Sequence, residues 1–206
     1  MRPCSVLAIF AFPLMVGVAI QAHATPYNVS LETTLLTGTD GVLALDFIDG
    51  GPPSGNVSVT DFHTDGTLLL QMSSGDVTGA LPGPVVLADG DFFNELLVTL
   101  TFGSTLSFVF TPTTMAPMPP SLPDSFSVFL LDPVSLLPLF PTSDPTGSNA
   151  LFHLDIDGTP TGFLSVFEIP GEEIVLRVRP AGVPEPETIG LLLAALAPIL
   201  ALRRGI

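Results

Sequence analysis

The sequence predicts an all-β fold, a jelly-roll-like sandwich of two packed antiparallel sheets between two apolar terminal segments. From residue 25 to residue 182, stretches of alternating apolar and polar residues are separated by clusters of Gly, Pro, Asp and Asn. This pattern is typical of half-buried strands joined by turns. The chain contains 22 Pro and 19 Gly, which interrupt helices. Roughly eight to twelve short strands favour a two-sheet sandwich.

The first half of this region divides into short strands at turn residues. The Gly, Asp and Pro content of residues 38–41 and 49–55 predicts loops, and Pro82-Gly83-Pro84 predicts a further turn. Asp65-Gly66 between two alternating runs predicts a tight hairpin. The expected strands are 27–31, 42–48, 56–63, 67–72, 77–81 and 85–87.

The second half contains the most apolar strands. Gly103-Ser104 predicts another tight hairpin, followed by a strand with Leu106, Phe108 and Phe110 on one face. The prolines of 112–123 and 133–148 predict loops, and Asp157-Gly158 predicts a turn between paired strands. The expected strands are 96–102, 106–111, 126–131, 151–156, 162–169 and 173–179, the last with Ile174, Leu176 and Val178 inward.

The N-terminal 24 residues have the organisation of a secretory signal peptide. Arg2 precedes an apolar run over 6–20, and Ala22-His23-Ala24 provides the small residues that signal peptidase requires. We expect cleavage after Ala24, so that a single secreted domain of residues 25–182 begins at Thr25. Cys4 is the only cysteine and leaves with the signal peptide, so no disulfide is expected in the mature domain.

Residues 183–206 combine a proline-rich entry, an apolar run and a basic end. Pro184 and Pro186 hold the segment Val183, Pro184, Glu185, Pro186 extended and accessible. A transmembrane helix is expected over 188–202, and it is short of the ~20 residues that a bilayer core requires. Arg203 and Arg204 predict a cytoplasmic C-terminus. The pattern therefore predicts a temporary membrane anchor.

This succession of Pro-Glu-Pro, short apolar helix and arginine pair resembles the PEP-CTERM sorting signal of Gram-negative bacteria that produce exopolysaccharide. The resemblance implies recognition and cleavage near the motif by an exosortase. The turn-rich segments 56–62, 64–67, 75–79 and 101–108 resemble an uncharacterised family of PEP-CTERM proteins. That second resemblance implies one β domain with a sorting tail, and it implies no catalytic residues.

The charge of the chain restricts its partners. The formal net charge is −15, from 20 Asp and Glu against 5 basic residues, and such a surface repels nucleic acids and anionic headgroups. We expect signal peptidase, the general secretion machinery, an exosortase and exopolysaccharide as partners. The expected route is export across the inner membrane, transient anchoring, and release to the cell surface or the extracellular space.

Paired carboxylates beside glycines are the candidate metal ligands. Asp155 with Asp157, and Asp89 with Asp91, lie two residues apart next to Gly, and Asp40, Asp46 and Asp49 are grouped near another glycine-rich loop. Carboxylates on turns suit Ca²⁺, although Asp-Gly is more often a plain turn. Calcium is the one cofactor that the sequence suggests.

Two histidines are expected in the mature domain, each with an aspartate on the same strand face. These pairs are His63 with Asp61 and His153 with Asp155. A Ser-His-Asp hydrolase also needs an activated serine, and no serine motif lies near either pair, so we expect no enzyme activity. Phe92-Phe93 interrupts the alternation and predicts an exposed aromatic ring.

The sequence favours a non-catalytic secreted surface or matrix protein. A calcium-assisted carbohydrate-binding module and a hydrolase are the alternatives.

Overall fold

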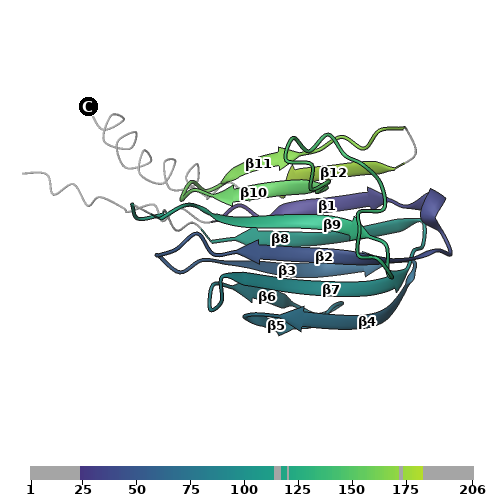
Figure 1. Ribbon diagram of the computed structural model, residues 1–206, viewed down its shortest axis with the longest axis horizontal. Coiled ribbons are helices and arrows are strands. Elements are labelled where there is room, and N and C mark those ends of the chain that lie inside the picture. Colours follow the sequence, from purple (N-terminus) through teal and green to yellow (C-terminus); the bar gives the residue numbers. More distant parts are fainter. Residues whose placement is uncertain (1–23, 114–116, 120, 172–173, 183–206) are drawn as a thin grey trace, which may run out of the picture.

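The computed structural model describes residues 24–113, 117–119, 121–171 and 174–182. Within these ranges the chain is a sandwich of two six-stranded antiparallel sheets stacked face to face (Figure 1). Residues 1–23, which belong to the predicted signal peptide and include Ala22, lie outside the described residues. So does the predicted sorting segment 183–206 with its predicted helix. No helix of the described residues is long and apolar enough to cross a membrane.

The strands confirm the all-β prediction, and each expected strand is present. The first sheet consists, in spatial order, of β12 (Val175–Pro180), β1 (Tyr27–Glu32), β8 (Thr105–Pro112), β3 (Asn56–Thr64), β6 (Val85–Ala88) and β5 (Val77–Gly79). The second consists of β11 (Phe163–Val166), β10 (Phe152–Ile156), β9 (Asp124–Leu131), β2 (Asp40–Ile48), β7 (Phe93–Thr101) and β4 (Thr67–Ser74). A short 3₁₀ helix, η1 (Thr34–Leu36), was not expected.

Because apolar and polar residues alternate along the strands, one face of each sheet is apolar, and these two faces form the core. On β8, Leu106, Phe108 and Phe110 are buried, as predicted. Phe110 stacks on Tyr27 of its own sheet and on Phe152 of the other, with ring centroids 4.9 and 5.3 Å apart, and Phe126 lies 5.3 Å from Phe110. Close aromatic packing between the sheets therefore contributes to the stability of a domain without disulfides.

Both tight hairpins predicted at Asp65-Gly66 and Gly103-Ser104 are wrong. β3 belongs to the first sheet and β4 to the second, and β7 and β8 are divided in the same way. Each link therefore crosses from one sheet to the other, and β3 pairs with β8 while β4 pairs with β7. The residues of a link show that the chain turns, but long-range contacts decide which strand becomes the neighbour.

The two crossing links are fixed to each other. The Asp65 carboxylate accepts hydrogen bonds from the backbone N–H groups of Ser104 at 3.1 Å and Thr105 at 2.8 Å. The Ser104 hydroxyl also donates to it, and these bonds hold the pKa of Asp65 well below its usual range. A Cβ on Gly66 would collide with the Thr101 carbonyl, and one on Gly103 would lie 2.5 Å from the Gly66 nitrogen. Glycine is required in both links.

The predicted turns at Pro82 and Asp157-Gly158 are confirmed, whereas the predicted loop 38–41 ends earlier, because β2 begins at Asp40. β5 and β6 pair around the Pro82 turn, and β10 and β11 pair across the Asp157-Gly158 turn. On β12, Leu176 and Val178 pack against the core while Arg177 is exposed.

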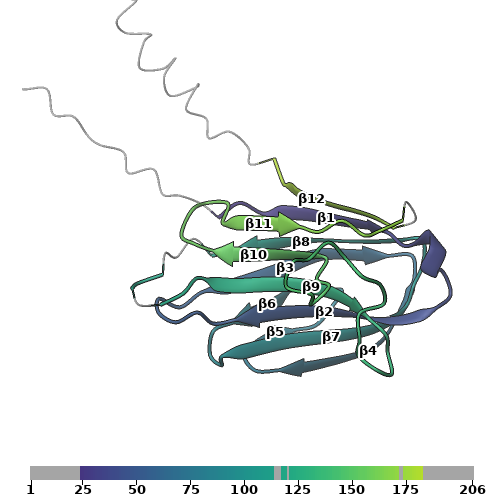
Figure 2. The same ribbon diagram turned by 45° about the horizontal axis from the view of Figure 1, so that its top comes forward.

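The two ends of the domain lie side by side. β1 pairs with β12 so that Tyr27 is opposite Pro180, and the Ala181 N–H donates to the Pro26 carbonyl at 2.7 Å. The adjacent ends of these two strands are visible in both views (Figures 1 and 2). Thr25 is buried, and its N–H donates to the Pro160 carbonyl at 2.9 Å. The flanking segments therefore join the domain at one corner.

Candidate functional site

A row of polar side chains crosses the outer face of the second sheet. Strand register places Ser165 of β11 opposite His153 of β10, and His153 opposite Ser127 of β9. The row continues through Asp46 of β2 to Glu95 of β7. Since successive residues of a strand point to opposite faces, these residues share the face that lies away from the core.

Hydrogen bonds connect Ser127, His153 and Asp155. The Ser127 Oγ lies 2.8 Å from the His153 Nδ1, and the His153 Nε2 lies 3.0 Å from the Asp155 Oδ1. The Asp155 carboxylate accepts from Nε2, so in the neutral imidazole Nε2 carries the proton and Nδ1 accepts the Ser127 O–H. The sequence prediction that His153 and Asp155 share a face is confirmed, and the serine beside them was missed.

The connection between β9 and β10 forms one wall beside this row. Its centre is Asp144, whose side chain accepts hydrogen bonds from the Thr146 N–H at 2.9 Å and the Ala150 N–H at 3.3 Å, and from the hydroxyls of Thr146 and Ser148. Burial alone would raise the pKa of Asp144, but the donors, led by the Ser148 hydroxyl, lower it to about 2. Asp144 is only 7% exposed, and it organises the loop as an anion.

The row and the loop enclose a pocket with a volume of ≈ 200 Å³, which we call the polar pocket. It is lined by Ser127, Asp144, Pro145, Thr146, Ser148, Ala150, His153, Ser165 and Phe167. The lining therefore combines hydroxyl groups, one imidazole and one carboxylate with the apolar side chains of Pro145 and Phe167. Sequence reasoning missed this pocket because strand register and a long loop combine to form it.

Three backbone N–H groups of the loop beside the polar pocket already have hydrogen-bond acceptors. The N–H groups of Thr146 and Ala150 donate to Asp144, and the Ser148 N–H donates to the Thr146 hydroxyl at 3.3 Å. Hydrolysis through a serine requires N–H donors directed at a developing oxyanion. The ionised Asp144 carboxylate in the same pocket would repel that oxyanion. The geometry favours binding of a neutral ligand.

The other histidine pair is not connected in this way. His63 and Asp61 line a hollow on the outer face of the first sheet together with Ser107. The register of β3 shifts between Thr60 and His63, and Asp61 has a positive φ of 51°. Asp61 accepts a hydrogen bond from the Thr60 hydroxyl at 3.2 Å.

The predicted calcium ligands have different partners, and Asp157 is the one that accepts hydrogen bonds within its own turn. Asp157 accepts from the Thr159 hydroxyl at 2.6 Å and N–H at 2.9 Å, which lowers its pKa, and Asp155 is bonded to His153. Asp89 accepts from the Gly55 N–H at 3.1 Å, and Asp91 is exposed. Among the residues that the structure describes, no group of three or more His, Cys, Asp or Glu can hold a metal ion. Calcium binding stays a prediction.

Asp40, Asp46 and Asp49 do not form one cluster, because they are distributed along and just beyond β2. Asp49 and Asp89 instead both lie near Asp124. Asp124 is buried, and the sequence did not single it out. Burial raises the pKa of Asp124, the Gly50 N–H at 2.9 Å lowers it, and the charges of Asp49 and Asp89 raise it further. This acidic group therefore forms part of the connections around Gly50.

Asp46 is the most strongly perturbed carboxyl group of the polar row. Burial and the neighbouring Glu95 raise its pKa to about 7, and its Oδ1 is buried without a hydrogen-bond partner in the described residues. Burial also raises the pKa of Glu95. At neutral pH Asp46 is partly protonated, so it acts as a pH-dependent element of the sheet face.

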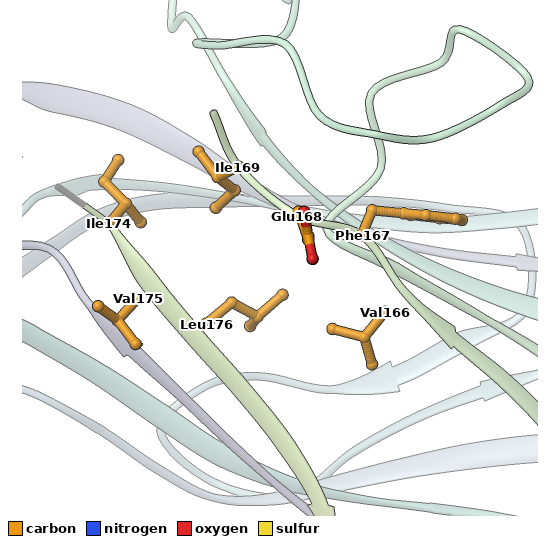
Figure 3. Close-up of a pocket in the computed structure, with 7 residues that line it drawn as sticks. All are labelled: Val166, Phe167, Glu168, Ile169, Ile174, Val175 and Leu176. Carbon is orange, nitrogen blue, oxygen red and sulfur yellow. The ribbon is translucent and has the colours of Figure 1, made fainter. Parts of the chain in front are cut away.

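A second, apolar cleft opens where β11 and the chain after it face β12. It has a volume of ≈ 410 Å³. Figure 3 shows Val166 and Ile169 on one side and Ile174 and Leu176 on the other. Glu168 lies on the same side as Ile169, and its carboxylate points into the cleft. Ile169, Ile174 and Leu176 also pack against the core. The cleft is the open edge of the sandwich, where the core comes close to the surface.

The prediction of an exposed aromatic ring at Phe92-Phe93 is confirmed, and both rings are exposed. Phe92 is 72% and Phe93 is 40% accessible, and both lie at the link between β6 and β7. The polar pocket lies elsewhere, on strands β9 to β11.

Comparisons with known proteins give no relative for this chain. No family model matches it, and neither a curated protein nor a solved structure is significantly similar.

Proposed function

We propose that the protein is a non-catalytic β-sandwich of the cell surface or extracellular matrix, delivered by an exosortase and associated with exopolysaccharide. The general secretion machinery exports it, signal peptidase removes residues 1–24, and the tail 183–206 anchors it until an exosortase acts near Pro184-Glu185-Pro186. One observation carries this proposal, namely that the described domain begins and ends at the same corner.

That placement makes both processing steps compatible with a folded domain. The strand pair β1 and β12 brings Thr25 and Gly182 to one corner, so removal of both flanking segments deletes no strand. A tail attached at this corner also leaves the remainder of the domain free to project away from the membrane. The acidic, disulfide-free composition agrees with a soluble domain outside the cell.

The polar pocket favours carbohydrate binding, with or without calcium, as the second candidate function. Its hydroxyl-rich lining supports this candidate. The hydrolase alternative would require turnover of an ester or glycoside that Ser127→Ala or His153→Ala abolishes.

Processing is tested by the mass of the mature protein in a host with an exosortase and in the same host with the exosortase gene deleted. We expect a species without residues 1–24 and without most of the tail in the first host, and a tail-bearing membrane species in the second. Pro184→Ala with Pro186→Ala should reproduce the deletion result. The matched control, Pro82→Ala with Pro84→Ala in an internal turn, should be processed normally.

An identical tail mass with and without the exosortase would contradict the proposal. Retention of residues 1–24 in the exported protein would contradict its signal-peptide part.

A further inference from the structure

We propose that the polar pocket binds one neutral sugar unit. The inference goes beyond the delivery route, because the pocket belongs to the folded domain and can bind whether or not the tail is processed. It gives the carbohydrate-binding candidate a location, a ligand class and a set of contacts.

The size of the pocket limits the ligand. Drug-sized ligands occupy pockets of about 300–1,000 Å³, and the polar pocket has ≈ 200 Å³. A single hexose ring matches this smaller volume, with the rest of a glycan extending into solvent past the exposed residues Pro145 and Thr146.

The hydrogen-bonding groups of the pocket suit a polyol. When the His153 Nδ1 accepts the Ser127 O–H, the Ser127 oxygen retains lone pairs that accept from a ligand hydroxyl. Ser165, next to His153 in register, has a hydroxyl that both donates and accepts. Sugar hydroxyls have the same dual capacity, so several of them can be satisfied in one orientation.

The pocket also has an apolar wall. Pro145 and Phe167 both line it. The C–H face of a sugar ring packs on such a surface while its hydroxyls face the serines. An amphipathic ring therefore satisfies both walls, and a simple alcohol or alkane satisfies only one.

Charge excludes the acidic sugars. The pKa of Asp144 is lowered to about 2, so its carboxylate is ionised at neutral pH, and Asp155 lies on the other side of His153. A uronic acid would bring a third carboxylate towards Asp144 and Asp155. The like charges would repel it, and a neutral hexose avoids this repulsion.

The pocket wall is preorganised. The Ser143 hydroxyl accepts from the Glu168 N–H at 2.8 Å, and the Ser143 N–H donates to the Glu168 carbonyl at 2.8 Å, which ties the loop to the chain after β11. Asn149 accepts from the Thr142 N–H at 3.0 Å and closes the loop on itself. A ligand therefore does not have to order this loop, and little affinity is lost on binding.

The test is saturation-transfer NMR with glucose, galactose, mannose, N-acetylglucosamine and glucuronic acid. The full-length chain is prepared in lauryldimethylamine oxide, a detergent that carries no sugar. We expect saturable binding of at least one neutral sugar, with glucuronic acid weaker. Ser127→Ala and His153→Ala should each weaken it about tenfold, the effect of a lost hydrogen bond.

The matched control is His63→Ala, which removes the histidine on the opposite sheet and should leave binding unchanged. Melting temperatures of the three variants close to that of the parent protein would show that the fold is retained. Absence of binding by every neutral sugar would overturn the proposal, and so would binding that survives both pocket substitutions. Tighter binding of glucuronic acid than of the neutral sugars would overturn the ligand class. None of these results would alter the masses that test the delivery route.

Discussion

At the scale of single residues, carboxyl groups with clearly shifted pKa values fall into two classes. Asp65, Asp144 and Asp157 accept several hydrogen bonds, and their pKa values are lowered. Asp46 and Glu95 are partly desolvated on the second sheet, and their pKa values are raised. The first class holds loops and links in place and contributes stability that is lost as the pH falls, whereas the second contributes stability that is lost as the pH rises.

Asp46→Asn should stabilise the protein above neutral pH. The folded-state pKa of Asp46 is raised from 3.8 to about 7. Between these values the unfolded chain releases a proton that the folded chain retains, so the contribution of Asp46 to stability is fully present below about pH 4 and is lost as the pH rises through about 7. The Asn variant lacks this decrease and should be more stable by about 1–3 kcal/mol at pH 8.

Urea unfolding of both proteins at pH 4, 6 and 8 measures this difference. Asp61→Asn on the opposite sheet is the matched control and should follow the parent protein. Glu95 contributes a decrease in the same direction, and it is present in every variant. If Asp46→Asn and the parent protein lose stability in parallel between pH 4 and pH 8, the proposed burial of the Asp46 charge is wrong.

At the scale of elements, the crossing links decide the topology. The short links at Asp65-Gly66 and Gly103-Ser104 resemble hairpin turns, yet each connects different sheets. Thr33, in the connection from β1 to β2, also belongs to this arrangement, because its hydroxyl donates to the Gly103 carbonyl at 2.8 Å. The three connections between sheets therefore support one another at this position.

Gly103→Ala should destabilise the domain strongly, because the added Cβ would overlap the backbone of the neighbouring link. Displacing two mutually bonded links costs on the order of 2–4 kcal/mol, in the range of overpacked buried sites. Gly182→Ala is the control, since a Cβ there meets nothing within 4 Å, and its effect should be near zero. Chemical denaturation measures both, and equal stabilities would contradict the close approach of the links.

At the scale of the whole molecule, the pairing of β1 with β12 closes the domain at its two ends. Linking residue 25 to residue 182 with a short Gly-Ser linker, and opening the chain between Met118 and Pro119, should give a folded circular permutant. Both residues at the new opening are exposed, and openings at exposed loops are tolerated when the natural ends are close.

Opening the same permutant between Ala44 and Leu45 is the control. These residues are buried in β2, which lies between β9 and β7, so this variant should not fold. Thermal unfolding followed by circular dichroism distinguishes the outcomes. Failure of the Met118 opening would contradict the adjacency of the ends.

The sequence predicted the strands well because the alternation of apolar and polar residues within a strand shows that one of its faces is buried. The alternation of Leu106, Phe108 and Phe110 requires one buried face, whatever the partner strands are. The same local reasoning placed His153 and Asp155 on one face. It did not identify Ser127, because an isolated serine in an alternating strand resembles any other solvent-facing residue.

Local residue chemistry by itself determined that this protein is an acidic, disulfide-free, all-β chain with turns at its Gly, Pro and Asp clusters. Only the tertiary structure decided which strands are neighbours, so it alone joined the links at Asp65 and Gly103 and brought Asp144 beside Ser127 and His153. The physical reason is that alternation and turn propensity act over a few residues, whereas strand pairing depends on contacts between distant segments that together bury the core.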